Sequence, residues 1–194
     1  MNTTERTGSV ANTKGFCLWF TGLSGAGKTT IAEIVGPELE RRGLAVEYLD
    51  GDVVRTHLSK GLGFSKEDRD TNIERIGWVA SRLTRHGGAV LVSAISPYEE
   101  TRQKARDMVE EHGPFVEVFV ATSVEECARR DVKGLYEKAF SGEIKEFTGV
   151  SDPYEEPVNP ELRIDTEAHE PEESAQIVVE TLAQLGLVET SVLA

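Results

Sequence analysis

The 194-residue sequence predicts an α/β fold in which helices cover both faces of a parallel β-sheet. One observation behind this is an alternation of short apolar runs, typical of buried strands, with longer amphipathic stretches, typical of helices. The other is a glycine-rich segment between the first apolar run and the first helix, at residues 22–29. Because the carboxyl ends of parallel strands lie at the same edge of the sheet, polar residues that follow the strands are expected to form the functional site.

Each element follows from local periodicity and composition. Apolar runs predict strands at residues 16–20, 44–49, 89–95, 115–120 and 162–164. A first helix begins at the end of the glycine-rich segment and continues through residue 39, and amphipathic spacing predicts further helices over residues 66–86, 98–112 and 172–185.

The domain organisation is expected to be simple, because the length suits one domain with a sizeable core. We expect a domain over residues 15–188, a flexible tail at residues 1–14 and a C-terminal tail at residues 189–194. Residues 131–157 have little periodicity and are long for a connection inside a compact domain, so they predict a lid over the site. A disordered insertion is the alternative for this segment.

Composition excludes several classes of protein. The formal net charge of −13 and the lack of a basic stretch argue against nucleic-acid binding. The two cysteines, Cys17 and Cys127, predict buried thiols with no disulfide framework. The histidines have no metal-ligand spacing, so no structural metal is expected; they are His57, His86, His112 and His169. The polar N-terminus and strand-sized apolar runs predict a cytoplasmic protein without a membrane segment.

The glycine-rich segment is a complete phosphate-binding loop of sequence Gly-Leu-Ser-Gly-Ala-Gly-Lys-Thr. Its glycines permit positive φ angles, so that backbone N–H groups point at phosphate oxygens next to a helix N-terminus. Lys28 is expected to reach the β- and γ-phosphates, and the Thr29 hydroxyl to bind Mg²⁺. The alternative is a glycine-rich hairpin with no chemistry. The predicted nucleotide-binding residues are Gly22, Leu23, Ser24, Gly25, Ala26, Gly27, Lys28, Thr29 and Thr30.

Two carboxylates follow the second predicted strand, at Asp50 and Asp52. The third strand ends at Ser96 without an acid, so these aspartates are the candidates for the acidic partners of the phosphate loop. We predict that Asp52 orients an acceptor hydroxyl and takes its proton, which a weak base can do because the phosphoryl-transfer transition state is loose. Asp50 is predicted to organise Mg²⁺ or to act as the alternative base. A surface Asp-Gly-Asp turn is the alternative.

Basic side chains recur at a spacing of three on the helix after the second strand, at Arg69 and Arg75 with Asn72 between them. Together with Arg55 they could form an anion cradle, since the planar guanidinium donates paired hydrogen bonds to phosphate or sulfate. By themselves they equally fit a solvated helix face. Phe64 and Phe147 could sandwich a purine, although either could be a core residue.

Several motifs in order along the chain resemble adenylylsulfate kinases over about residues 14–188. The motifs are Gly22–Thr30, Asp50-Gly-Asp-Val-Val-Arg55, Leu62-Gly-Phe-Ser-Lys-Glu-Asp-Arg69 with Asn72-Ile73, Ser93-Ala-Ile-Ser-Pro-Tyr98, Asp131-Val-Lys-Gly-Leu-Tyr136, Glu143-Ile-Lys145, Phe147-Thr-Gly149 and Asp152-Pro-Tyr-Glu155. The resemblance implies a P-loop kinase fold and transfer of the γ-phosphoryl of ATP, with Mg²⁺, to the 3′-hydroxyl of adenylylsulfate. It also implies a homodimer and a functional link to a sulfate adenylyltransferase.

The resemblance also assigns roles to individual residues. Those expected to hold adenylylsulfate are Arg55, Phe64, Arg69, Asn72, Ile95, Lys133 and Phe147. Ser96 matches a serine described in the family as a phosphoserine intermediate, whereas its position at a strand end suggests a phosphate-orienting hydroxyl. The chain departs from the family pattern at Glu99, Phe140 and Glu146, where relatives commonly carry Arg, Arg and Gly, so weaker binding of anionic substrate or product is expected.

Three other functions stay open at this point, and two of them are disfavoured. A P-loop kinase for another hydroxyl-bearing metabolite would share the phosphate loop but not the aromatic and basic set of the acceptor site. A nucleotide-binding regulatory subunit is disfavoured by the presence of Lys28, Thr29 and Asp52. A regulatory GTPase is disfavoured because the chain has no Asn-Lys-x-Asp motif.

Overall fold

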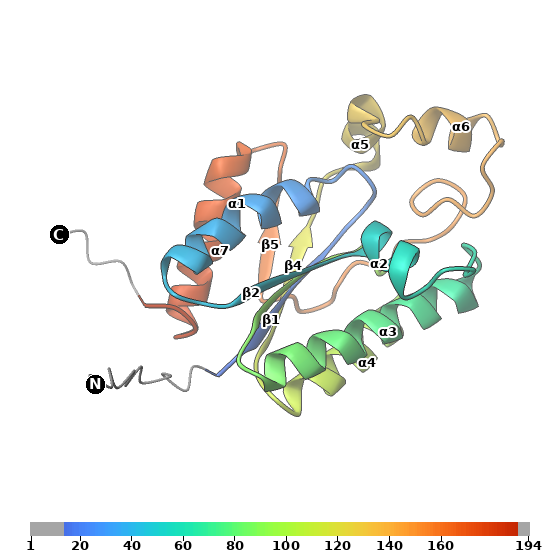
Figure 1. The fold of residues 1–194 in the computed structure, drawn as a ribbon. Coiled ribbons are helices and arrows are strands. Elements are labelled where there is room, and N and C mark those ends of the chain that lie inside the picture. The colour runs from blue at the N-terminus through green and yellow to red at the C-terminus, as the bar shows by residue number, and fades with distance from the viewer. Residues whose placement is uncertain (1–13, 190–194) are drawn as a thin grey trace, which may run out of the picture.

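The computed structural model describes residues 14–189. They form a five-stranded, fully parallel sheet in the order β2-β3-β1-β4-β5, with helices on both faces (Figure 1). The strands are β1 (Phe16–Thr21), β2 (Val46–Asp50), β3 (Ala89–Ser93), β4 (Phe115–Val120) and β5 (Leu162–Ile164). The helices are α1 (Lys28–Arg41), α2 (Gly51–His57), α3 (Lys66–Arg85), α4 (Glu99–Glu110), α5 (Val124–Arg130), α6 (Tyr136–Phe140) and α7 (Pro171–Gln184). The predicted fold class is confirmed.

The central strand β1 explains the two layers, because its side chains alternate between them. Phe16, Leu18 and Phe20 pack with α1 and α7 on one face. Cys17 and Trp19 pack with α3 and α4 on the other face. All five side chains are fully buried, which is why this strand is a continuous apolar run in the sequence rather than an alternating pattern.

Close packing of α3 on α4 depends on a small residue in each helix. A Cβ added at Gly77 of α3 would lie 2.8 Å from the Cβ and 2.9 Å from the Cα of Ala105 of α4. The helices can therefore approach each other only because Gly77 has no side chain.

Two predicted strands are shorter in the structure than in the sequence analysis. β2 begins at Val46 rather than residue 44, and β3 ends at Ser93, where its pairing with β1 and β2 stops. The chain then turns at Ser96, which has a positive φ of 42°. Helix α2 was not anticipated; its formation follows from the Asp50 side chain, which accepts hydrogen bonds from the N–H groups of Asp52 and Val53 as an N-cap.

The segment predicted as a lid spans residues 131–157 and holds the short helix α6. Figure 1 shows it leaving α5, extending beyond the carboxyl ends of the strands and returning toward the sheet. None of the helices within residues 14–189 has the length and apolar content required to cross a bilayer. Apart from Lys14 and Glu189, the predicted tails lie outside the described residues.

Candidate active site

The phosphate-binding loop connects β1 to α1 and has the backbone geometry that its glycines permit. Gly22, Gly25 and Gly27 have φ angles of 141°, 77° and 109°. At Gly22 the chain passes so close to β4 that an added Cβ would lie 2.5 Å from the Val120 carbonyl oxygen. Substitution there would therefore be strained both sterically and conformationally.

The ammonium group of Lys28 lies inside the loop. Its Nζ donates to the carbonyl oxygens of Gly22 at 3.0 Å and Leu23 at 2.7 Å. The side chain is buried, and this burial lowers the pKa of Lys28 to about 8; the charge of Lys133 acts in the same direction, and Asp50 and Asp52 oppose it. The ammonium donates only to neutral carbonyl oxygens, so a bound phosphate group would give it a negatively charged partner.

Asp50, at the end of β2, joins the phosphate loop to helix α2. Its Oδ1 accepts the N–H of Asp52 at 2.9 Å, and its Oδ2 accepts the Thr29 hydroxyl at 3.0 Å. A hydroxyl beside a carboxylate is a pair of hard oxygen ligands of the kind Mg²⁺ binds. The donor set therefore fits the predicted metal, although no cluster of three or more His, Cys, Asp or Glu side chains that could hold a metal occurs within residues 14–189.

The side chain of Asp52 projects from the first turn of α2 and is largely exposed. Its Oδ2 pairs with the Nζ of Lys133, which belongs to the lid. This ion pair connects the predicted base to a residue predicted to bind the acceptor. No local pattern indicates this pairing, because 81 residues separate the two positions.

A cavity of about 520 Å³ lies between the phosphate loop, the strand ends and the lid. It is lined by residues from all three. The predicted site residues that line it are Ser24, Gly25, Gly27, Lys28, Thr29, Thr30, Asp50, Asp52, Phe64, Arg69, Ile95, Lys133 and Phe147. The carboxyl-end rule therefore located this cavity correctly, and the fold brings into it residues that are more than 120 positions apart.

The two phenylalanines of the cavity differ in their surroundings. Phe64 is 61% exposed, so it is not a core residue, and the guanidinium of Arg55 lies 4.7 Å from the centre of its ring. Phe147 packs edge-on against Tyr136, with ring centres 4.9 Å apart. A flat aromatic base between the two rings would contact Phe64, whose ring also faces the Arg55 guanidinium, and Phe147, whose ring is packed against Tyr136.

Arg69 lines the cavity from α3 and also holds the lid. It is buried and donates from Nη1 to the Thr148 hydroxyl at 2.8 Å, from Nε to the Phe64 carbonyl at 2.7 Å and from Nη2 to the Glu146 carbonyl. The lid loop at residues 146–148 is therefore attached to the same guanidinium that was predicted to bind an anion.

The structure does not place all predicted site residues on the cavity wall. Arg55 donates to the Gly63 carbonyl at 2.8 Å, and Arg75 donates to the Leu58 carbonyl at 2.9 Å. Asn72 is buried on α3, and its Oδ1 has no hydrogen-bond partner among the described residues. Ser96 is also buried: its Oγ accepts from Trp19 Nε1 at 3.1 Å and donates to Thr21 Oγ1 at 3.0 Å. These four residues are not part of the cavity lining, and neither are Gly22, Leu23 and Ala26 of the phosphate loop.

A second cavity, of about 840 Å³, lies on the other side of the phosphate loop between α5 and the start of α7. Gly25, Gly27 and Thr30 line both cavities, so the loop forms the wall between them. Arg130 and Thr166 line the second cavity, and Arg130 donates to the hydroxyl of Thr166 at 3.0 Å. Neither residue was predicted from the sequence. Applying the carboxyl-end rule to β5 would have identified Thr166, which follows that strand.

The three departures from the family pattern have defined positions. Glu99 pairs with Arg102 at the start of α4, and Phe140 is 61% exposed at the end of α6. Glu146 has a positive φ of 54°, which suits the glycine common in relatives better than a residue with a side chain. We expect the strain at Glu146 to be tolerated because its carbonyl accepts from Arg69.

The fold and the site define the class of protein, which is a P-loop phosphotransferase. The features that define it are a parallel sheet with a phosphate loop after its first strand, a hydroxyl–carboxylate pair beside that loop and a second cavity across it. Comparisons with known proteins specify the class further. The family model described as adenylylsulphate kinase matches residues 14–165.

Relatives and solved structures agree with this match. An adenylyl-sulfate kinase of Picosynechococcus is 57% identical over 175 residues, which cover 90% of this chain and 97% of the relative. A protein of Sorangium cellulosum whose name reads "Probable bifunctional SAT/APS kinase 2" is 53% identical, over 90% of this chain and 29% of its own. The structure of the Mycobacterium tuberculosis APS kinase CysC in complex with AMPPNP and APS has a TM-score of 0.84 at 45% identity, covering 87% of this chain and 98% of that chain.

The chain belongs to the adenylylsulfate kinase family. Its activity is the phosphorylation of adenylylsulfate to 3′-phosphoadenylylsulfate.

Proposed function

We propose that the two cavities divide the two substrates of this kinase reaction. ATP lies across the phosphate loop with its nucleoside in the cavity at Arg130 and Thr166, and adenylylsulfate lies in the cavity at Asp52, Phe64 and Phe147. The observation that carries this proposal is that the phosphate loop forms a wall of both cavities. A phosphoryl group held by that loop can be reached from the acceptor side.

On the acceptor side, Asp52 orients the 3′-hydroxyl of adenylylsulfate toward the γ-phosphorus. The hydroxyl oxygen forms a bond to phosphorus, the bond from phosphorus to the β,γ-bridging oxygen breaks, and ADP leaves. The hydroxyl proton passes to the Asp52 carboxylate. Ser96 takes no covalent part in this direct transfer, and its buried hydroxyl, bonded to Trp19 and Thr21, supports the strand-end turn instead.

Lys28 holds the β- and γ-phosphates. Phosphate oxygens then replace the carbonyl oxygens of Gly22 and Leu23 as acceptors of its hydrogen bonds. The hydroxyl of Thr29 and the carboxylate of Asp50 would hold Mg²⁺, which offsets the charge that the phosphates carry. The phosphosulfate of the acceptor is matched by Lys133 and by Arg69, with Arg55 and Asn72 supporting the wall behind it. Lys133 must leave Asp52 when the anion enters, which exposes the carboxylate to the ribose hydroxyl.

The test is an ATP-consumption assay coupled to ADP release, run over a panel of hydroxyl acceptors that includes adenylylsulfate, adenosine 5′-monophosphate and simple sugars. We expect turnover with adenylylsulfate to exceed every other acceptor by at least a hundredfold. Equal turnover with another metabolite would favour the alternative small-molecule kinase. ATP binding without turnover on any acceptor would favour a regulatory subunit.

The cellular setting that we propose is the cytoplasm, where ATP is available, with a homodimer as the working unit and a sulfate adenylyltransferase as supplier of the substrate. The joining of SAT to a related kinase in the Sorangium protein supports that functional link. Light scattering of the purified protein at micromolar concentration tests the dimer: a mass of about 21 kDa, that of one chain, would contradict it.

A further inference from the structure

The lid returns to the body of the protein at residues 152–155, which we call the lid root. Glu155 makes three bonds to one segment. Its N–H donates to the Pro97 carbonyl at 2.8 Å, its Oε2 accepts the N–H of Glu99 at 2.7 Å, and its carbonyl accepts from Arg102 Nη2 at 2.7 Å. Because Tyr98 provides no side-chain cap for α4, the Glu155 carboxylate performs that function.

The other residues of the lid root are bonded to the same part of the fold. The hydroxyl of Tyr154 is 2.9 Å from Thr21 Oγ1, and Thr21 directly precedes the phosphate loop. The hydroxyl of Tyr98 donates to Asp152 Oδ2 at 2.9 Å. The lid root is therefore fixed to the end of β1 and to the β3–α4 connection.

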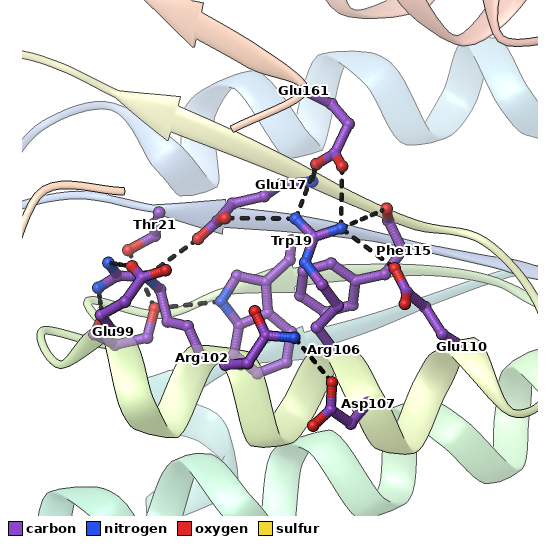
Figure 2. Close-up of polar contacts among 12 residues, drawn as sticks. Trp19, Thr21, Glu99, Arg102, Arg106, Asp107, Glu110, Phe115, Glu117 and Glu161 are labelled. Atoms are coloured by element: carbon purple, nitrogen blue, oxygen red, sulfur yellow. Dashed lines mark hydrogen bonds and ion pairs between the residues drawn. The ribbon is translucent and has the colours of Figure 1, made fainter. Parts of the chain in front are cut away.

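Arg102 of α4 lies at the centre of these contacts and is only 1% exposed. Its Nη1 donates to the Ser96 carbonyl at 2.7 Å, while its Nη2 donates to Glu155 in the lid root. Two carboxylates balance its charge: Glu99, and Glu117 of β4, whose Oε1 lies 3.0 Å from Arg102 Nε (Figure 2). Nε makes this ion contact but no hydrogen bond within residues 14–189. The cost of burying the guanidinium is therefore offset by the two carboxylates and by the hydrogen bonds from Nη1 and Nη2, which makes these contacts mutually dependent.

These contacts connect opposite walls of the acceptor cavity. Ser93, Ala94 and Ile95 line one wall and lead directly into Ser96, whereas Phe147 and Thr148 line the lid wall a few residues before the lid root. Arg102 itself is not among the lining residues. Any effect that it has on the bound substrate must pass through the backbone segments that it joins.

We propose that Arg102 is a positioning residue of the acceptor site, which together with Tyr154 fixes the lid root on residues 96–99 and so sets the spacing between the strand-end wall and the lid wall. The proposal rests on the assignment of this cavity to adenylylsulfate. It predicts that loosening the lid root weakens acceptor binding and leaves nucleotide binding intact, because the second cavity contains no residue of the lid root.

The neighbouring Arg106 offers a matched control. It belongs to the same helix and is 3.3 Å from the same Glu117, but its other partners are Glu161 at 2.8 Å, Glu110 at 3.2 Å and the Phe115 carbonyl at 3.3 Å (Figure 2). Those partners lie away from the lid root, at the end of α4, at the start of β4 and just before β5. A lysine at position 106 therefore disturbs the ion network without touching the lid root.

The experiment compares Arg102→Lys with Arg106→Lys. Lysine keeps the charge but lacks the planar fork, so it cannot donate to Ser96 and Glu155 in the same geometry. For Arg102→Lys we expect the KM for adenylylsulfate to rise at least tenfold and the KM for ATP to stay within twofold. We also expect faster hydrogen exchange, without any ligand, in peptides that contain the amides of Glu99 and Glu155. Arg106→Lys should leave both KM values and these peptides unchanged.

Tyr154→Phe is the second variant, and it tests the role of the lid root in acceptor binding even if Arg102→Lys does not fold. It removes only the hydroxyl that joins the lid root to Thr21, so we expect a rise of about threefold or more in the KM for adenylylsulfate and faster exchange across residues 153–157. Equal effects of the two lysine variants, equal rises in both KM values, or an unchanged Tyr154→Phe would overturn the proposal. Failure of the wild-type enzyme to use adenylylsulfate would instead reject the proposed function, and the exchange measurements would still test the lid root.

Discussion

Asp52 can interact either with Lys133 or, in the proposed complex, with the acceptor hydroxyl, and the reaction requires the second interaction. In the structure it pairs with Lys133 of the lid, and in the proposed complex it faces the ribose hydroxyl. Because Asp52 is exposed on the first turn of α2, its carboxylate stays solvated when it leaves Lys133, and no buried charge loses its partner.

Replacing Asp52 by Asn should lower kcat by about a hundredfold, because the group that orients the hydroxyl and takes its proton is lost. The affinity for ATP should change little. Steady-state kinetics with a separate measurement of nucleotide binding provide the check. Asp50→Asn is the matched control: asparagine still caps α2, but we expect a raised Mg²⁺ requirement. A large loss of ATP binding in Asp52→Asn would instead assign this residue to the metal.

Burial of Lys28 gives nucleotide binding a pH dependence. Its pKa is lowered to about 8 in the free protein, so the ammonium is increasingly neutral above that pH. A polyphosphate favours the charged form and raises the pKa in the complex, so binding takes up a proton. Between pH 7.5 and 9.5 we expect the Kd for ADP, measured by calorimetry with EDTA and without metal, to rise by up to tenfold per pH unit. Lys28→Arg, which stays charged, should lose this dependence; an unchanged slope would contradict the expectation.

Ser96, in the turn after β3, provides a further test at the residue scale. Ser96 is buried, and its hydroxyl is bonded to Trp19 and Thr21. Ser96→Ala should therefore retain most of the kcat, with a loss of stability of about 1 kcal/mol from the broken hydrogen bonds. A loss of activity of several orders of magnitude in a folded Ser96→Ala protein would support the covalent phosphoserine route.

At the scale of elements, the α3–α4 contact depends on the missing side chain of Gly77. Alanine favours a helix by about 1 kcal/mol over glycine, but its Cβ would lie 2.9 Å from the Ala105 backbone. Overpacking costs about 1–3 kcal/mol, so we expect Gly77→Ala to destabilise the protein by about 1 kcal/mol net. Urea unfolding measures this change.

A second substitution tests the cause of that effect. Adding Ala105→Gly to Gly77→Ala removes the Cβ on the opposite helix, so the two changes should be non-additive in a double-mutant cycle. Glu74→Ala on the same helix removes only an exposed contact to Lys104 and should change stability by less than about 1 kcal/mol. Additive losses from positions 77 and 105 would show that the close approach is not the reason.

At the scale of the whole molecule, the proposed ligand sites lie where the strand ends, the phosphate loop and the lid converge. A ligand that binds only this folded arrangement stabilises it by about 2.7 kcal/mol at a concentration of 100 Kd. We expect ATP analogues to raise the Tm by several degrees in the wild type and in Asp52→Asn, but far less in Lys28→Ala, whose kcat should also fall at least a hundredfold. Scanning calorimetry tests this order, and an equal rise in Lys28→Ala would reject the role of the loop.

The sequence by itself determined the layout of this protein. Apolar runs and period-3.6 patterns are local, so β4 and β5 were located to the residue and α3 nearly so. The phosphate loop could also be predicted, since its glycines must occur consecutively in the chain. Asp50 was placed at a strand end by the same local reasoning, although its capping of α2 was not foreseen.

Only the tertiary structure decided which distant side chains meet. The pairing of Asp52 with Lys133, the second cavity at Arg130 and Thr166, and the contact of Arg102 with the lid root all join residues separated by 36 to 81 positions. Such contacts depend on how the connections pack beyond the sheet edge. Charge and burial there are set by neighbours from several elements, and no periodicity in one segment can specify them.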